Sequence, residues 1–203
     1  DSDKNVRLKK KFEIINGVKV YRSRYWFRLS LYTFFFPGLI GRLIWNKYDI
    51  VHSHVSAHDH VLFAGIIAAL KFRPHVHTTH CPWTDKFRPL AVRIPLWFAD
   101  NFLNYISFFF CDTVIAITPW EIPKLKRWVS EKKIVTLPNG MDQILFKKVK
   151  PNNFRKRFNI KSKKLVLFFG RLHPNKAPHV LAHVAKEVIK ERKDIDFIFV
   201  GPD

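Results

Sequence analysis

The chain has 203 residues, of which 47% are hydrophobic, and its 36 Lys and Arg against 16 Asp and Glu give a formal charge of +20. This apolar content is enough to bury a sizeable core, and two cysteines are too few for a disulfide scaffold, which favours a reducing, cytoplasmic compartment. The charge implies an anionic partner, namely a nucleic acid, acidic lipid headgroups or a phosphorylated substrate.

The first quarter of the chain predicts a hairpin followed by an apolar helix. Residues 12–15 and 18–21 are strand patterns on either side of the turn pair Asn16-Gly17. Residues 26–45 predict a helix that is broken near Pro37-Gly38. The uncharged part of this segment is too short to cross a bilayer, so we expect no membrane-spanning helix.

From residue 49 onward, short strand patterns alternate with helical ones, which predicts an α/β architecture with parallel sheets. A helix over 119–129 should begin after Thr118 as its N-cap, and Glu121, three residues on, is expected to serve in capping. The other predicted elements are strands at 49–54, 76–79, 113–117 and 134–137 and helices at 61–70 and 90–110.

A second unit follows a change of composition after residue 146. Residues 147–164 are polar and basic and are predicted to be a linker. We therefore predict a partial domain over 1–146, the linker over 147–164, and the start of another domain over 165–203, with strands at 165–169 and 197–200 around a helix at 178–192. Two strands are too few for an independent sheet, and the first unit lacks the glycine-rich turn that usually opens a doubly wound domain. We expect a fragment that lacks both ends of a longer protein.

Six segments carry a family resemblance through their order and spacing. They are DIVHSH (49–54), VHTTH (76–80), CDTVIAITPWEIPKL (111–125), IVTLPNGMD (134–142), VLFFGRLHPNKAPHVL (166–181) and FIFVGPD (197–203). Together they resemble the family 4, or group 1, glycosyltransferases. The resemblance implies a GT-B-like fold, with two Rossmann-like domains, and metal-independent, retaining transfer of a sugar, of hexosyltransferase type, from a nucleotide diphosphate donor.

The same resemblance implies roles for five residues. Arg171 and Lys176 would contact the donor diphosphate, and His80 would lie beside the transferred sugar. Asn139 and Gly140 would belong to the loop that closes the N-terminal domain at the cleft between domains. No cofactor and no metal ion is implied. The sequence departs from the family in having Ala-Pro after the lysine, where Gly is usual, and the family's paired-glutamate segment would lie beyond residue 203, so we expect the fragment alone to be inactive.

The chemistry of these residue types agrees with such roles. Arg171 and Lys176 directly follow a predicted parallel strand, at the end where α/β proteins bind ligands. An Arg fork and a Lys charge stabilise the negative charge that grows on a departing diphosphate, and a helix N-terminus adds a favourable dipole. His80 has the analogous position in the first unit and can hydrogen-bond a sugar hydroxyl. The alternatives are two solvated cations and a structural histidine.

Seven of the ten histidines lie between His52 and His80. The run from 52 to 60 resembles the H-x-H-x-D-H pattern of metallo-hydrolases, but extra residues before Asp59 break the spacing that a metal needs. We therefore predict no metal site and interpret these residues as a polar lining for an acceptor. His77 could face this lining or the core.

The predicted partners are a nucleotide-sugar donor, a sugar or lipid-linked acceptor, and an anionic membrane surface. Aromatic and basic residues occur together at 26–45, and a second aromatic cluster at 105–110 follows several basic residues, a combination that suits the cytoplasmic face of a membrane. Two alternatives remain: a non-catalytic remnant of a split gene, and a basic nucleic-acid-binding module. Because the cations are spread along the chain and no nucleic-acid motif occurs, we expect no nucleic acid.

Overall fold

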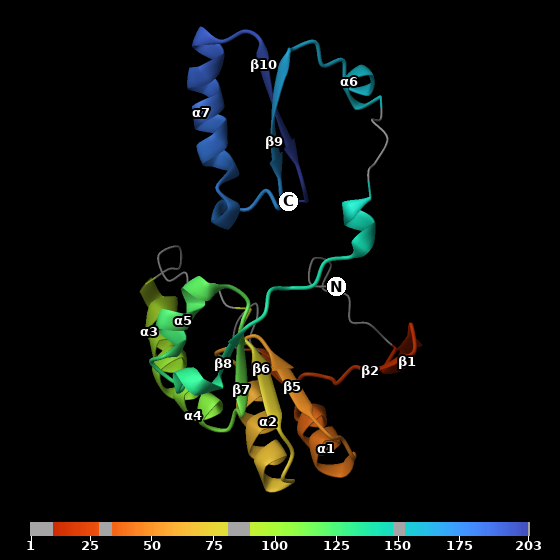
Figure 1. The fold of residues 1–203 in the computed structure, drawn as a ribbon, viewed down its shortest axis with the longest axis vertical. Helices are drawn as coiled ribbons and strands as arrows, with labels where there is room; N and C mark the ends of the chain where they lie inside the picture. Colours follow the sequence, from red (N-terminus) through yellow and green to blue (C-terminus); the bar gives the residue numbers. More distant parts are fainter. Residues whose placement is uncertain (1–9, 29–33, 81–89, 148–152, 203) are drawn as a thin grey trace. The chain divides into compact units, whose positions relative to one another are not determined.

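The computed structural model describes residues 10–28, 34–80, 90–147 and 153–202 and contains two compact units, Asp1–Gly140 and Met141–Asp203 (Figure 1). The first unit is built on a four-stranded sheet in the order β5-β6-β7-β8, in which every neighbouring pair is parallel. These strands are Val51–His54, His75–Thr78, Thr113–Ala116 and Ile134–Thr136. The predicted α/β architecture is confirmed.

Helical connections join these strands, because a parallel neighbour can be reached only by a crossover. Between β5 and β6 lies α2 (Asp59–Leu70). Between β6 and β7 the chain forms α3 (Leu90–Phe98), the π-helix η3 (Ala99–Leu103) and α4 (Asn104–Phe109). The last crossover contains the 3-10 helix η4 (Pro119–Glu121), α5 (Ile122–Leu125) and the 3-10 helix η5 (Glu131–Lys133).

The main core of the first unit lies between β7 and the helices that follow and precede it. Val114 and Ala116 point from β7 into a cluster with Phe108, Leu125 and Trp128, all of which are buried. A smaller cluster joins Val51 to Ala64 and Ala68 of α2. Val114 and Ala116 are alternate residues of β7, as expected for a strand that packs one face against helices.

The N-terminal hairpin is confirmed, but the helix predicted over 26–45 is wrong in its first half. Strands β1 (Phe12–Ile15) and β2 (Val18–Tyr21) pair antiparallel around a turn. Further on, β3 (Phe27–Arg28) pairs antiparallel with β4 (Phe34–Phe35), and only Pro37–Trp45 forms the helix α1. The reason is local, because a proline starts a helix well but holds the residue before it in an extended conformation.

The second unit contains a parallel pair of strands, β9 (Lys164–Phe169) and β10 (Ile195–Val200), joined by α7 (Pro178–Glu191). Before them come the 3-10 helix η6 (Gln143–Phe146) and the short helix α6 (Phe154–Arg157), and η7 (Pro174–Lys176) precedes α7. The linker prediction therefore overlooked α6. The ring of Phe154, its first residue, lies 4.8 Å from the ring of Phe158, which follows the helix, measured between centroids. The predicted domain boundaries themselves stay predictions.

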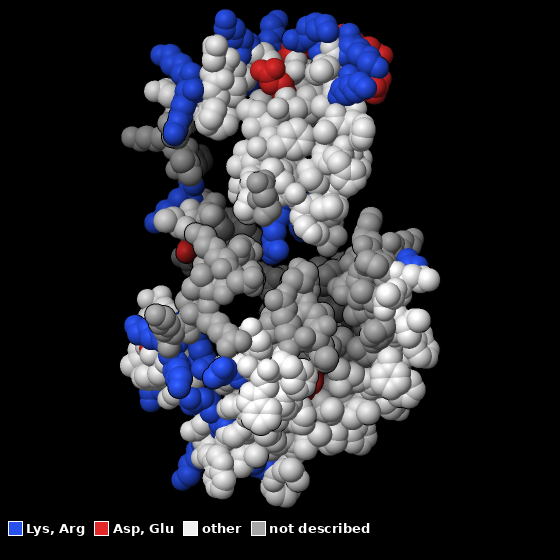
Figure 2. Space-filling model, turned by 180° about the vertical axis from the view of Figure 1, so that it is seen from behind, with Lys and Arg blue, Asp and Glu red and all other residues white. Residues whose placement is uncertain are grey.

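Basic side chains gather at one end of the second unit. Figure 2 shows Lys and Arg concentrated where α7 ends and β10 begins, and Lys190, Arg192 and Lys193 are exposed there. This is the amino-terminal end of β9 and β10, opposite the end at which Arg171 follows β9. No helix within the described part of the chain is long and apolar enough to span a membrane.

Two glycines allow a matched test of the packing around α2. A Cβ at Gly65 would lie 2.7 Å from the Cβ of Phe110 and 3.0 Å from Nδ1 of His75, whereas a Cβ at Gly41 in α1 would meet nothing within 4 Å. Gly65→Ala should lower the free energy of unfolding by about 1–3 kcal/mol through overpacking. Gly41→Ala should raise it by up to about 1 kcal/mol, because Ala favours helix.

Urea unfolding of the full-length protein, followed by circular dichroism, measures both changes. Equal stabilisation by both substitutions would contradict the close packing of α2 against β6.

Candidate functional site

Histidines gather at the carboxyl-terminal edge of the first sheet. Nδ1 of His54 lies 3.0 Å from Nε2 of His80, and the rings of His52 and His54 are 4.3 Å apart between centroids. His60, on the first turn of α2, lies with its Nε2 2.9 Å from the carbonyl oxygen of His54. His52 and His54 are exposed on one face of β5 and His80 is half-buried, so the structure brings His80 together with these two histidines. The polar lining for an acceptor stays a prediction.

Beneath this edge a chain of hydrogen bonds runs through the core. Ser56 Oγ is 3.0 Å from Nε2 of His77, and Ser53 Oγ is 2.8 Å from both Nδ1 of His77 and Nε2 of His75. The Nδ1 of His75 is 3.3 Å from the carbonyl oxygen of Phe110, which can only accept, so Nδ1–H of His75 donates. The direction of every bond then follows: Ser56 donates to His77, His77 to Ser53, and Ser53 to His75.

Both histidines of this chain are neutral in that arrangement. His75 and His77 are fully buried, and burial lowers the pKa of each, for His77 well below its usual value. Desolvation disfavours the charged imidazolium, and the nearby histidines add repulsion. His77 therefore belongs to the core and not to the exposed edge.

The backbone at this edge adopts conformations that are rare outside glycine. Val55, Ala57 and His80 have φ values of 71°, 62° and 43°. Such residues cost about 1–3 kcal/mol each and persist where surrounding contacts fix them. Here the N–H groups of Val55 and Ala57 donate to Thr78 O at 3.0 Å and to Oδ1 of Asn104 at 2.7 Å. Three of the seven described non-glycine residues with positive φ thus lie at this edge.

Glu121 has a different role from the predicted one. Thr118 stands at the N-cap of η4 but makes no side-chain capping bond. Its hydroxyl instead lies 3.2 Å from Oε1 of Glu121, and the hydroxyl of Thr79 donates to Oε2. Glu121 is only 1% exposed. Its partner Thr79 could not be predicted from sequence spacing, because the two residues are 42 positions apart.

The second unit presents its predicted residues at the corresponding edge. Arg171 follows β9 directly and Lys176 ends η7, just before α7, and both are exposed. The carboxyl ends of β9 and β10 approach closely, because Leu172 N donates to Pro202 O at 2.8 Å and a Cβ at Gly201 would lie 1.7 Å from the carbonyl oxygen of Gly170. Only glycine fits at position 201.

Asn139 and Gly140 are exposed residues that follow β8 at the end of the first unit. The roles predicted for these two residues, for His80, and for Arg171 and Lys176 stay predictions. Among the described residues no three His, Cys, Asp or Glu side chains converge as a metal would require, and the metal-independent reaction likewise stays a prediction.

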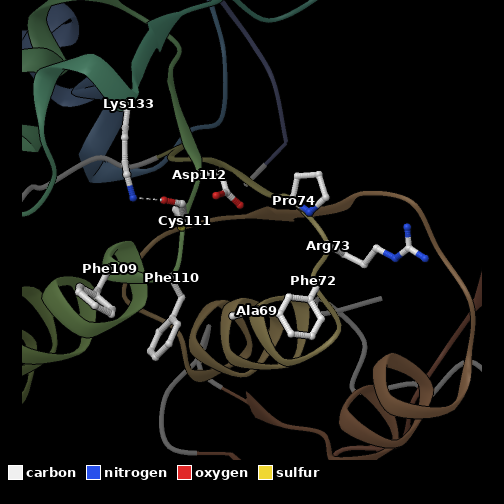
Figure 3. Close-up of a pocket in the computed structure, with 9 residues that line it drawn as sticks. All are labelled: Ala69, Phe72, Arg73, Pro74, Phe109, Phe110, Cys111, Asp112 and Lys133. Atoms are coloured by element: carbon white, nitrogen blue, oxygen red, sulfur yellow. Dashed lines mark hydrogen bonds between the residues drawn. The ribbon is translucent and has the colours of Figure 1, made fainter.

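A hollow of about 440 Å³ lies at the opposite, amino-terminal edge of the first sheet (Figure 3). Its walls include the nearly fully exposed ring of Phe72, and Nζ of Lys133 donates to the carbonyl oxygen of Cys111 at 2.7 Å. Burial raises the pKa of the Cys111 thiol to about 12, so this cysteine is protonated and cannot serve as a nucleophile. The other residues that line the hollow are Ala69, Arg73, Pro74, Phe109, Phe110 and Asp112.

The buried histidines predict how stability depends on pH. Their folded-state pKa values lie below the unfolded value of about 6.5, so the unfolded chain binds more protons, and stability falls as the pH drops below about 6.5. The loss should reach about 1.4 kcal/mol per pH unit for each such histidine. Urea titrations of the full-length protein at pH 7.5 and 5.0 measure it. His77→Gln should unfold more easily at pH 7.5 but lose less stability on acidification; an unchanged pH dependence would contradict the buried neutral state.

Comparisons with known proteins give one consistent family. A family model described as Glycosyltransferase Family 4 matches residues 3–143. The phosphatidylinositol N-acetylglucosaminyltransferase GPI3 subunit of Saccharomyces cerevisiae (strain YJM789) is 29% identical over 199 residues, which cover 93% of this chain and 42% of that protein. The 2-deoxystreptamine N-acetyl-D-glucosaminyltransferase of Niallia circulans is 25% identical over 165 residues, or 77% of this chain and 41% of that protein.

Solved structures show the same fold. Anabaena Alr3699/HepE in complex with UDP and glucose has a TM-score of 0.59 at 19% identity, covering 81% of this chain and 43% of that chain. Its complex with UDP-glucose has a TM-score of 0.57 at 18% identity, covering 81% and 42%. The predicted GT-B-like fold is confirmed, and the chain spans less than half the length of the relatives it matches. By the family match over residues 3–143, this chain belongs to glycosyltransferase family 4.

Proposed function

We propose that the whole protein transfers a hexosyl group from a nucleotide diphosphate sugar to an acceptor with retention of the anomeric configuration, without a metal. The observation that carries this proposal is the pair of exposed cations, Arg171 and Lys176, at the carboxyl end of a parallel strand. Beside them lies the start of α7, a 14-residue helix whose N-terminus attracts negative charge. A diphosphate fits this combination better than a neutral ligand does.

In this proposal the two cations act on the leaving group. Breaking the bond between the sugar and the diphosphate transfers charge to the diphosphate oxygens, and Arg171 and Lys176 stabilise that charge, as a divalent cation would in a metal-dependent transferase. His80 hydrogen-bonds a hydroxyl of the transferred sugar, with its ring oriented by His54 at 3.0 Å. Because Nε2 of His80 faces His54, Nδ1 is the ring nitrogen that is proposed to meet the hydroxyl.

The relatives suggest which donor and acceptor to test first. Two of them are named as N-acetylglucosaminyltransferases, and the solved neighbour is described with UDP and UDP-glucose. The yeast relative is named for phosphatidylinositol. We therefore propose UDP-N-acetylglucosamine as the donor and a lipid-linked acceptor such as phosphatidylinositol.

A lipid-linked acceptor would require contact with a membrane surface, and we propose that the first unit provides it at the cytoplasmic face. The helices from α3 to α4 expose a stripe of large apolar side chains at helical spacing, and a free protein rarely leaves so many such side chains in water. We call this set the 90–109 stripe; it consists of Leu90, Ile94, Trp97, Phe98, Phe102, Tyr105 and Phe109. Tyr and Trp suit a membrane interface because their rings are amphipathic.

The donor site is tested by removing one cation at a time. Arg171→Ala and Lys176→Ala in the full-length enzyme should each weaken binding of UDP and slow transfer, because a hydrogen bond to a charged group contributes about 1.5–3 kcal/mol. This corresponds to about tenfold to hundredfold in Kd. Isothermal titration with UDP measures the change.

Lys163→Ala is the matched control, because this exposed lysine precedes β9 at the opposite end of the same strand. It should bind UDP like the wild type. If Arg171→Ala and Lys176→Ala also bound UDP like the wild type, the proposed donor site would be wrong.

The membrane contact is tested by co-sedimentation with liposomes. Binding should rise with the content of anionic lipid, fall with salt as charges are screened, and fall in the double variant Trp97→Ser and Phe109→Ser. Ile14→Ser, which changes an exposed apolar residue on β1, should bind like the wild type. Full-length enzyme that ignored anionic liposomes at low salt would rule the contact out.

A further inference from the structure

We propose that Glu121 is a positioning residue for His80: its buried carboxylate fixes the side chain of Thr79 and thereby the backbone and ring of the histidine that follows. The inference rests on the proposed function only for what His80 does to the sugar. The restraint itself is a matter of hydrogen bonds within the first unit.

The carboxylate of Glu121 is buried. Glu121 is 1% exposed, and Thr79 is fully buried. Moving a carboxylate out of water is costly unless hydrogen bonds satisfy it. Within the described part of the chain no cation pairs with Glu121; its two oxygens accept from the hydroxyls of Thr79 and Thr118, the second at 3.2 Å. These two hydrogen bonds satisfy the buried carboxylate, and the one from Thr79 ties the side chain of Thr79 to Glu121.

Thr79 joins several elements of the first unit. Its N–H donates to the carbonyl oxygen of Ile115 on β7 at 3.2 Å, and its own carbonyl oxygen accepts from the N–H of Ser56 at 3.2 Å. The backbone of Thr79 is thus tied to β7 on one side and to the loop after β5 on the other. Glu121 adds a restraint from η4, so three elements meet at this one residue.

His80 has an unusual backbone conformation. Its φ of 43° is one that residues other than glycine rarely adopt, and such a conformation is kept only where neighbours impose it. His80 follows Thr79 directly, and its ring reaches His54 at 3.0 Å. Because Thr79 cannot turn without breaking its bond to Glu121, the carboxylate sets the direction in which the chain presents His80.

A carboxylate with no cationic partner is a poor choice for stability alone. Buried ionic groups can often be replaced by apolar residues without loss of stability. A simple structural role therefore predicts that variants of Glu121 change the unfolding free energy and nothing specific to His80. The positioning role predicts a local change at His80 in a protein that is still folded.

The experiment uses the full-length protein and two substitutions, each of which removes the hydrogen bond between Thr79 and Glu121. Glu121→Ala deletes the carboxylate, and Thr79→Val deletes the hydroxyl while keeping the shape; Thr79→Ser is the conservative control, since it keeps the hydroxyl. The side-chain NMR signals of ¹³C-labelled histidine give a readout that needs no substrate, and His80→Asn identifies the signal of His80. Urea unfolding shows which variants are folded.

The signal of His80 should move or broaden in Glu121→Ala and Thr79→Val and stay near its wild-type position in Thr79→Ser. Thr79→Val is the fallback if Glu121→Ala does not fold. A folded Glu121→Ala or Thr79→Val whose His80 signal equals that of the wild type would overturn the inference.

Turnover of UDP-N-acetylglucosamine with vesicles that contain phosphatidylinositol links the restraint to the reaction. Glu121→Ala should lower kcat by about tenfold or more with little change in the KM for the donor, because misplacing a group costs rate more than binding. In the background of His80→Ala the same substitution should have almost no further effect, since coupled residues are not additive.

The two proposals fail in different ways. If His80→Ala leaves kcat unchanged, the role proposed for His80 in transfer is wrong, while the NMR signals still decide whether Glu121 positions it. A second outcome is that His80→Ala lowers kcat, and that Glu121→Ala lowers kcat by the same factor in the wild type and in His80→Ala. Glu121 then acts independently of His80, and the inference is overturned.

Discussion

The arrangement of the first unit depends on the parallel register of β5 and β6, in which Ser53 lies opposite His77 and His54 opposite Thr78. In this register one serine hydroxyl reaches two buried histidines, each at 2.8 Å. A slip of one residue would turn the exposed histidines of β5 into the core and leave the buried ones without partners. The polar core and the histidine edge are thus two results of one pairing.

The same residue type serves two purposes on these two strands because its surroundings differ. His75 and His77 are enclosed, neutral and fully hydrogen-bonded, and they hold β5 and β6 together through Ser53. His52 and His54 alternate with buried residues on β5 and remain in contact with solvent. A buried polar network that is completely satisfied fixes one arrangement, since any other leaves a donor or acceptor unpaired. This rigidity suits an edge where the backbone is held at unusual angles.

The two units share a design that is common in α/β proteins. In each, side chains suited to a polar ligand follow the carboxyl ends of parallel strands, where loops can vary without disturbing the sheet. The first unit presents hydrogen-bonding imidazoles and the second presents an Arg and a Lys beside a helix N-terminus. The match to glycosyltransferase family 4 covers residues 3–143 and so includes the edge of the first unit.

The sequence by itself determined the strands from β5 onward, the parallel α/β class and the family, because these depend on local hydrophobic pattern and on short motifs. It was misleading at 26–45, where an apolar aromatic run reads as a helix although Phe27 and Phe35 pair across two strands. Only the tertiary structure decided which histidines are buried and what Glu121 contacts, because these depend on register and on partners such as Thr79, 42 positions away in the sequence. A local sequence pattern cannot identify a contact residue that comes from a distant segment, because only folding brings the two together.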